Sequence, residues 1–478
     1  MDTASFQFVL FGLAVAVLSN FSRSRVWRSV VLLVASLVFI GLLTHDPVSL
    51  LPLAGFLLLG YGCLVALERG WSRLMAWSIL AIIFAYVWLK KYTFLPEQGF
   101  LHFPYFTLGL SYIFFRVLHL LIESGDGSDK RHVGLGAYLL YTLNFTTFVS
   151  GPIQRYDDFA RDQFTNEPPP LNAAIVGLQL ERLVRGFFKV NVLAMFLHAF
   201  QQDAVLQVSE AMPLNLKLFA AVRLFTLYPL FLYCNFSGYI DVVIAIARLM
   251  RITLPENFNR PFSAACVMDF WNQWHITLSS WFKSYVYNPL LLALMRRISS
   301  RAAEPFLGVL CFFVTFFLVG IWHGRTSEFV VFGLLTGFGV SINKLWQIGL
   351  TQAMGRKGYK GLAKNLMYRA FGRGLTFSWF AFTLLCFWGD WQQVHSIFAA
   401  LSPMHWLGVW AAIWLSATVL LALWEIARAA LLLLKTSDGP VLTSRYARVV
   451  YASALGLAAL FFTALMSQPA PGIVYKAF

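Results

Sequence analysis

The chain has 478 residues, of which 59% are hydrophobic and 12% are charged. A typical soluble domain is about one quarter charged, so this composition excludes a soluble globular protein. The formal net charge of +15 comes from Lys and Arg residues in short segments between apolar stretches, which is typical of a membrane protein and not of a nucleic-acid-binding face. We therefore expect membrane lipid as a partner and no nucleic acid.

Apolar stretches recur along the whole chain. About 20 apolar residues form one membrane-spanning helix. The first stretch, Phe6 to Leu18, has no basic leader and is expected to be a retained span. Because lipid offers backbone groups no hydrogen-bond partner, we expect an all-α polytopic integral membrane protein that forms one domain over residues 1–478, with roughly 11–14 transmembrane helices plus interfacial or re-entrant amphipathic helices. The candidate spans are residues 5–19, 27–44, 47–67, 73–90, 104–122, 134–150, 172–199, 215–233, 236–250, 304–322, 328–348, 372–388, 406–433 and 449–466.

Basic residues in the short loops predict the orientation of the chain, because cytoplasmic loops are enriched in Lys and Arg. Loops around Arg25, Arg69, Arg131 and Lys357 are therefore expected to be cytoplasmic. The N-terminus, the 389–405 connection and the tail are poor in basic residues and are expected to be extracytoplasmic. Lys90 and Lys91 fall on the predicted outer side, against this rule.

The segment from residue 257 to 290 is too polar for lipid and too aromatic for an exposed linker. From Asp269 onward the spacing is that of a helix, and it predicts one amphipathic helix that lies in the membrane interface or dips into the domain. Its apolar side is formed by Trp271, Trp274, Leu278, Trp281 and Tyr285, and its polar side by Asn272, His275 and Ser279.

Two histidines are candidates for chemistry. An ionisable residue inside a membrane domain usually marks a functional path, and Asn272 and Ser279, one turn to either side of His275, are expected to fix its tautomer. His323 ends an apolar run, and Gly324 beside it permits a helix break and close approach by a substrate. Taken alone, His323 is equally typical of a helix-terminal histidine bonded to a carbonyl, and the aromatic stripe is typical of an interfacial helix.

Other catalytic patterns are absent from the sequence, which has no GxSxG, HExxH, P-loop or dinucleotide motif. The five cysteines are scattered singly, so no metal site is predicted. The isolated carboxylates Glu123, Asp241, Glu328 and Glu425 are interpreted as paired structural groups, with a proton-relay role as the open alternative.

Two motifs resemble those of the membrane-bound O-acyltransferase family, in its bacterial envelope branch that contains the teichoic-acid D-alanyl transfer protein and the alginate O-acetylation protein. DFWNQWHITLSSWF at Asp269 to Phe282 resembles the tryptophan-rich histidine motif, and GIWHG at Gly320 to Gly324 resembles the WHG motif. The resemblance covers about residues 108–342, with supporting stretches at 108–123, 148–159, 236–243 and 255–262. At 283–284 and 325–328 the sequence departs from the family pattern, so the acceptor side of the site is expected to differ.

The resemblance implies an O-acyltransferase in the bacterial cytoplasmic membrane. It implies transfer of a D-alanyl or acetyl group from a cytoplasmic thioester donor to a hydroxyl of a cell-envelope glycopolymer or of an intermediate carrier. Three stretches resemble the D-alanyl transfer protein more than the alginate one and favour D-alanyl transfer: Phe115-Arg116, Ile122-Glu123 and Ser150-Gly151-Pro152-Ile153. Acetylation of an exopolysaccharide of the alginate or cellulose type, a lipid-linked glycan transporter and an inactive scaffold stay open as alternatives.

The resemblance also implies roles for individual residues. His323 matches the catalytic histidine of the family and is the expected general base, and His275 matches its other motif histidine. Asn272 is the expected oxyanion donor, and Ser279 keeps an acyl-enzyme route open. The candidate substrate-binding residues are Asn257, Arg260, Asn272, Trp274, Ser279 and Trp322.

No tightly bound cofactor is implied. The co-substrate is an acyl thioester, either a phosphopantetheinyl carrier protein or acyl-CoA. We expect an acyl-carrier protein to bind on the cytoplasmic side, where basic loops suit an acidic partner. A separate extracytoplasmic partner is expected to complete delivery to the polymer.

Overall fold

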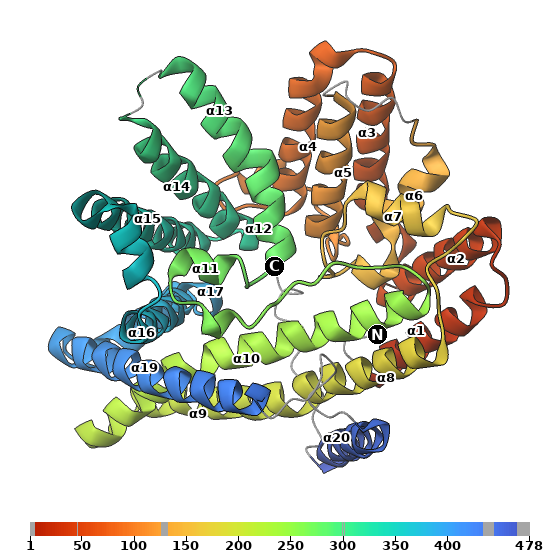
Figure 1. Cartoon of the computed structure of the whole chain (residues 1–478). Coiled ribbons are helices and arrows are strands. Elements are labelled where there is room, and N and C mark those ends of the chain that lie inside the picture. Colours follow the sequence, from red (N-terminus) through yellow and green to blue (C-terminus); the bar gives the residue numbers. More distant parts are fainter. Residues whose placement is uncertain are drawn as a thin grey trace. The chain divides into compact units, whose positions relative to one another are not determined.

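The computed structural model of the chain is built from helices (Figure 1). It describes residues 5–44, 46–125, 132–298, 300, 302–433 and 444–465, and in these residues there is one isolated β-bridge and no strand. Ten of the described helices are long and apolar enough to cross a membrane, and Phe6–Ser19 is a shorter apolar helix. The prediction of an all-α polytopic membrane protein is confirmed.

Some boundaries of the expected spans are wrong. The spans at 215–233 and 236–250 form a single helix, α10 (Leu214–Leu249), that continues through Pro229. The spans at 104–122 and 134–150 contain only the shorter helices α5 (Leu110–Gly125) and α6 (Leu135–Leu143). These differences reduce the fourteen expected spans to the ten long helices and the shorter Phe6–Ser19.

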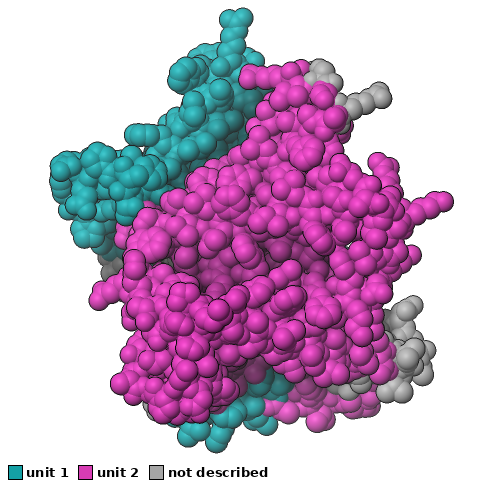
Figure 2. Space-filling view, turned by 90° about the vertical axis from the view of Figure 1, so that its left-hand side faces the viewer, with its two compact units in different colours: residues 1–191, 236–256, 455–478 teal, residues 192–235, 257–454 magenta. Residues whose placement is uncertain are grey.

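The contacts of the chain divide it into two compact units, which Figure 2 shows in different colours. The first unit comprises residues 1–191, 236–256 and 455–478, and the second comprises residues 192–235 and 257–454. Helix α10 contributes residues to both. The expectation of a single domain over residues 1–478 stays a prediction.

The first unit is held together in part by buried cations that bond to backbone oxygens. Arg116 on α5 is 2% exposed and donates to the carbonyl oxygens of Tyr141 (3.2 Å), Thr142 (2.7 Å) and Thr147. A buried charge is tolerated only when its donors are satisfied, so Arg116 fixes the turn after α6. The helices of the first unit are α1 (Phe6–Ser19), α2 (Arg25–Leu43), α3 (Leu51–Glu68), α4 (Met75–Leu89), α5, α6, α7 (Tyr156–Gln163), α8 (Ala173–Phe188), the second part of α10, and most of α20 (Arg445–Leu465).

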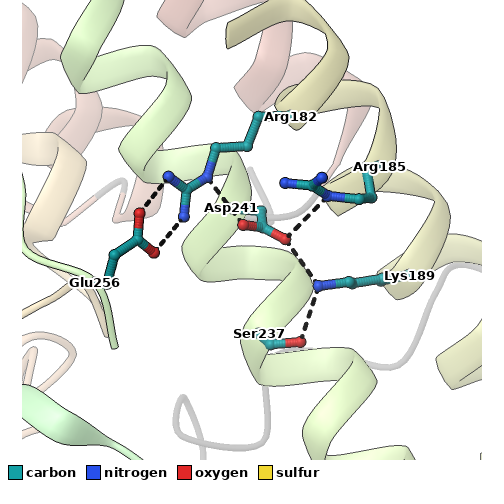
Figure 3. A network of polar contacts seen from close by, with 6 residues as sticks. All are labelled: Arg182, Arg185, Lys189, Ser237, Asp241 and Glu256. Carbon is teal, nitrogen blue, oxygen red and sulfur yellow. Dashed lines mark hydrogen bonds and ion pairs between the residues drawn. The ribbon is translucent and has the colours of Figure 1, made fainter. Parts of the chain in front are cut away.

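An ion network in the first unit joins α8 to α10 (Figure 3). Asp241 accepts from Arg182 Nε at 2.9 Å and from Lys189 Nζ at 2.8 Å. Arg182 also makes two bonds of 2.6 Å to the carboxylate of Glu256. The prediction that Asp241 is a paired structural group is confirmed.

In the second unit, α14 (Glu304–His323) and α15 (Ser327–Leu362) pack closely against each other. Gly320 and Gly333 allow the two backbones to touch, since a Cβ atom at Gly320 would lie 2.1 Å from the Cα atom of Gly333. Small residues at helix contacts are the usual means of close packing in membranes. Its other elements are α9 (Met195–Ser209), the first part of α10, α11 (Val267–Trp271), α12 (Ile276–Phe282), a π-helix (Lys283–Tyr287), α13 (Asn288–Arg297), α16 (Leu366–Thr383), α17 (Leu385–Trp388), α18 (Trp391–Ala399) and α19 (Pro403–Leu433).

The single amphipathic helix expected from Asp269 is wrong. Helix α11 ends at Trp271, and His275, with φ of 47°, adopts a left-handed conformation before α12 begins. The stripe of Trp271, Trp274 and Trp281 is buried in the second unit, at 4%, 2% and 8% exposure. Burial of these aromatic side chains inside the second unit, and not one lipid-facing side, explains the aromatic spacing.

We predict that Gly320→Ala lowers stability because its methyl group meets backbone atoms, which cannot move as a flexible side chain does. Overpacking of this kind costs about 1–3 kcal/mol. Thermal unfolding of the detergent-solubilised protein measures this loss of stability. Gly349→Ala on α15 is the matched control, since nothing lies within 4 Å of a Cβ atom there. Equal melting temperatures for the two variants would contradict this description of the α14–α15 contact.

Candidate functional site

The backbone on either side of α11 folds back on itself and brings two distant residues together. Phe258 and Trp274 form an antiparallel bridge. Asn259 N–H donates to the Gln273 carbonyl at 2.9 Å, and Ile276 N–H donates to the Asn257 carbonyl at 3.0 Å. The left-handed turn at His275 completes this arrangement, and it places the Asn257 side chain beside the imidazole ring.

The side-chain oxygen of Asn257 determines the tautomer of His275. Asn257 Oδ1 accepts from the Thr277 backbone N–H at 3.1 Å and from the Thr277 hydroxyl at 2.9 Å, and it lies 3.2 Å from His275 Nδ1. A backbone N–H can only donate, so the Asn257 atom in this position is the oxygen. His275 Nδ1 therefore carries the proton, and Nε2 is the acceptor nitrogen of the ring.

The other end of the same amide is an unused donor. Asn257 is fully buried, and its Nδ2 atom has no hydrogen-bond partner among the described residues. Leaving a buried polar group unsatisfied costs roughly 1–3 kcal/mol. A bound molecule with an acceptor oxygen would satisfy this N–H₂ group.

His323 ends α14 and is 3% exposed. Its ring centroid lies 4.8 Å from that of Trp322, 5.9 Å from that of Phe332 and 5.2 Å from that of Phe387. The His275 ring, which is 1% exposed, lies 6.5 Å away, centroid to centroid. Two imidazoles thus share one buried aromatic enclosure.

Burial affects the protonation of His275, which lies outside the ten candidate spans. Desolvation first, and the neighbouring His323 second, hold the pKa of His275 well below its usual value. The ring is therefore neutral near pH 7, as its Nδ1–H tautomer requires. No group of three or more His, Cys, Asp or Glu side chains gathers for a metal ion within the part of the chain that the structure describes.

The other predicted site residues fall into two groups. Trp274 and Trp322 are buried at 2% and 7% exposure, and Ser279 is half-buried. Asn272 and Arg260 are exposed. The expectation that Asn272 and Ser279 fix the His275 tautomer is wrong, because Asn257 occupies that position. Their roles in substrate binding stay predictions.

Sequence reasoning missed three contributors to the site. Thr277 holds the Asn257 oxygen, and Phe332 and Phe387 pack against His323. A polar β-branched residue two positions after a histidine was the one local signal for Thr277. Phe332 and Phe387 carry no signal of their own, since they are two of 46 phenylalanines.

The unusual run after Gly324 binds another part of the second unit. Glu328 accepts from the Trp391 backbone N–H at 3.1 Å, and Ser327 accepts from the Trp391 indole at 2.7 Å. The carboxylate of Glu328 thus has a structural partner at the start of α18. The helix break expected at Gly324 is confirmed, since α14 ends immediately before it. A Cβ atom at Gly324 would lie 2.1 Å from the Phe329 ring, and the close approach of a substrate there stays a prediction.

Comparison with known proteins adds independent information. The family model of MBOAT, the membrane-bound O-acyltransferase family, matches residues 74–387. A teichoic acid D-alanyltransferase of Streptococcus thermophilus is 30% identical over 295 residues, which are 59% of this chain and 68% of that protein. A peptidoglycan O-acetyltransferase of Helicobacter pylori is 29% identical over 214 residues, 44% of this chain and 37% of that protein.

A probable alginate O-acetylase of Pseudomonas fluorescens is 28% identical over 237 residues, 50% of this chain and 44% of that protein. The chain thus matches about two thirds or less of the length of these relatives. The family model covers well over half of the chain and includes both histidine motifs. The chain is a multi-pass membrane O-acyltransferase and belongs to the membrane-bound O-acyltransferase family.

Proposed function

We propose that the protein moves a D-alanyl or acetyl group from a cytoplasmic thioester donor to a hydroxyl of a cell-envelope glycopolymer or of an intermediate carrier. The observation that carries this proposal is the buried pair of His275 and His323 with the Asn257 amide beside it. The named relatives transfer D-alanyl or acetyl groups. The D-alanyltransferases match at 30–32% identity and the alginate O-acetylases at 26–28%, which favours D-alanyl.

His323 is the proposed general base. It takes the proton of the acceptor hydroxyl while the oxygen attacks the thioester carbonyl carbon, an ester C–O bond forms and the C–S bond breaks. The imidazolium then returns its proton to the departing thiolate, so the enzyme is unchanged at the end. A neutral imidazole is suited to this work because its unprotonated ring nitrogen can accept the proton and later return it.

His275 is the proposed positioning residue for the acceptor. With its proton on Nδ1, its Nε2 accepts a hydrogen bond and cannot donate one to a carbonyl. It therefore orients a second hydroxyl or N–H group of the acceptor and not the thioester, since the single proton of the attacking hydroxyl goes to His323. The ring centroids are 6.5 Å apart, so a donor group held by His275 lies beside the hydroxyl that His323 deprotonates.

Asn257 takes over the oxyanion role that the sequence suggested for Asn272. Its buried Nδ2 carries two N–H bonds that no described residue accepts. The negative charge on the carbonyl oxygen grows as the tetrahedral intermediate forms. A fixed donor in a water-poor site stabilises that charge more than the ground state.

The donor, partners and location belong to the same proposal. A phosphopantetheinyl carrier protein or acyl-CoA supplies the thioester as a co-substrate from the cytoplasm, and basic loops attract its acidic surface. An extracytoplasmic partner completes delivery to the polymer. The protein lies in the bacterial cytoplasmic membrane with its N-terminus outside, as the distribution of basic residues predicts.

We predict that His323→Ala reduces acyl transfer by at least about 100-fold, since loss of a positioned acid or base costs about 10²–10⁴. His275→Ala is predicted to reduce it by about 100-fold, since misplacement of a substrate costs about that much. The host lacks the native gene, and membrane levels are matched. Mild base releases ester-linked D-alanine and acetate from envelope polymers, and both are quantified. Release of D-alanine would support the favoured acyl group, and release of acetate would support the exopolysaccharide alternative. If neither ester depends on the protein, the proposed function is wrong.

Substitutions at Asn257 separate its two roles. Asn257→Asp keeps an oxygen for His275 Nδ1 and Thr277 but removes the N–H₂ donor, so we predict a fall in kcat of about 10²–10³, typical of a lost oxyanion donor, with little change in KM. Asn257→Ala removes both functions, and its kcat is predicted to fall further. A kcat of Asn257→Asp close to the wild-type value would show that Nδ2 does not stabilise the oxyanion.

Ser280→Ala is the matched control within the same motif, because Ser280 is exposed and is not a candidate site residue. We predict that it keeps at least about half of the wild-type kcat, as surface substitutions usually perturb stability by less than about 0.5 kcal/mol. Ser279→Ala is predicted to behave likewise if transfer is direct. A loss of activity in Ser279→Ala together with a trapped acyl-serine would support the acyl-enzyme route instead.

A further inference from the structure

A groove in the second unit lies apart from the two histidines. It is formed by α15, α16 and α19 together with residues 265–267 and has a volume of about 520 Å³. This volume is within the range of about 300–1,000 Å³ that is usual for small-molecule sites. Neither histidine lines it. Its walls are mainly aromatic, with Trp346, Tyr368, Phe371, Trp379, Trp410 and Trp414.

The length of the groove matches one membrane leaflet. Tyr368 and Trp379 both line it and lie eleven positions apart on α16. At about 1.5 Å per residue this is about 16 Å. The hydrocarbon core of a bilayer is about 30 Å thick, so one leaflet contributes about 15 Å.

The two ends of the groove differ in polarity. At one end the Trp346 indole N–H donates to the Tyr368 hydroxyl at 3.1 Å. At the other end Trp379 lies against Gly339, where a Cβ atom would be 2.4 Å from the indole nitrogen. Tyr and Trp with a polar atom at one end are enriched at the level of the lipid headgroups. The Trp346–Tyr368 end is therefore the headgroup end.

The chain around the headgroup end is strongly basic. Residues 329–389 contain seven Lys or Arg residues and no Asp or Glu. Lys364 and Arg369 are exposed and flank the first turn of α16, which Asn365 caps by accepting from the Tyr368 N–H. Three more exposed basic residues precede them, Arg356, Lys357 and Lys360. Asp269 is the exposed carboxylate nearest in sequence to the lining residues 265–267.

We propose that this groove binds one acyl chain of an anionic membrane phospholipid, with the headgroup phosphate beside Lys364 and Arg369. The apolar walls and leaflet length suit a hydrocarbon chain, and the basic cluster selects a negative headgroup by charge complementarity. This lipid is a bound structural ligand and not the acyl donor. The proposal is independent of the acyl-transfer chemistry proposed above.

The test uses native mass spectrometry of the full-length protein in detergent with dipalmitoyl phosphatidylglycerol, and dipalmitoyl phosphatidylcholine as the neutral probe. The double variant Ile342→Trp/Leu375→Trp fills the groove from two lining positions that are 57% and 43% exposed. Leu345→Trp is the matched control, because Leu345 is also 43% exposed on α15 but does not line the groove. Melting temperatures confirm that the variants are folded.

We expect phosphatidylglycerol to bind the wild-type protein with a one-to-one component at least tenfold tighter than phosphatidylcholine. The groove-filling variant should weaken that component at least tenfold, and Leu345→Trp should leave it unchanged. Equal phosphatidylglycerol binding by the groove-filling and control variants would overturn the proposal. Recovery of a second copy of the chain, and not of lipid, on the open groove would overturn it as well.

Charge reversal tests the headgroup separately and does not alter the groove. Lys364→Glu/Arg369→Glu should bring phosphatidylglycerol binding to within about threefold of phosphatidylcholine binding, whereas Arg25→Glu, an exposed basic residue of the first unit, should keep the preference. An unchanged preference after the double reversal would contradict the headgroup assignment. Acyl transfer is measured in parallel, so failure of the lipid site and failure of the proposed enzyme reaction are distinguishable.

Discussion

The oxygen of the Asn257 side chain is the group on which the site depends. It accepts hydrogen bonds from the backbone N–H and the hydroxyl of Thr277. Because this atom is therefore an oxygen, it also accepts a hydrogen bond from His275 Nδ1–H. One amide thus fixes the tautomer of the ring, connects two segments that are 18 residues apart, and keeps its own N–H₂ buried without a described partner. The left-handed turn at His275 persists because these bonds and the Phe258–Trp274 bridge determine it.

The surrounding helices satisfy a second constraint, which is that buried polar groups in a membrane protein need partners within the chain. Arg116 bonds to three carbonyl oxygens of the first unit, and Asp241 pairs with Arg182 and Lys189. In the second unit, the glycine contact between α14 and α15 places the end of α14, and with it His323, against Phe332. The N–H₂ of Asn257 has no partner among the described residues and lies on the same side chain that holds His275, which makes it a place for a ligand.

Hydropathy predicts the spans well because each crossing helix must be apolar over about 20 residues, and this signal is local. It fails where the structure depends on distant contacts. The spacing from Asp269 to Tyr285 predicted one helix, but Trp271, Trp274 and Trp281 are buried on more than one side, so a helical period was present without a continuous helix. Asn257 was named as a candidate, yet its pairing with His275 depends on a backbone bridge that no local pattern encodes. Asn272 lies in the same motif as His275, and it was therefore expected to fix the tautomer that Asn257 fixes.

The central claim is that Asn257 holds His275 with its proton on Nδ1. Solid-state NMR of the protein labelled with ¹⁵N at histidine, in lipid bilayers near pH 7, measures which ring nitrogen is protonated, and the His275 signals among the nine histidines are assigned by their loss in His275→Ala. The account predicts a neutral ring with a protonated Nδ1 in the wild type and a mixture of tautomers in Asn257→Ala. A wild-type ring protonated on Nε2, or a tautomer that does not change in Asn257→Ala, would contradict it.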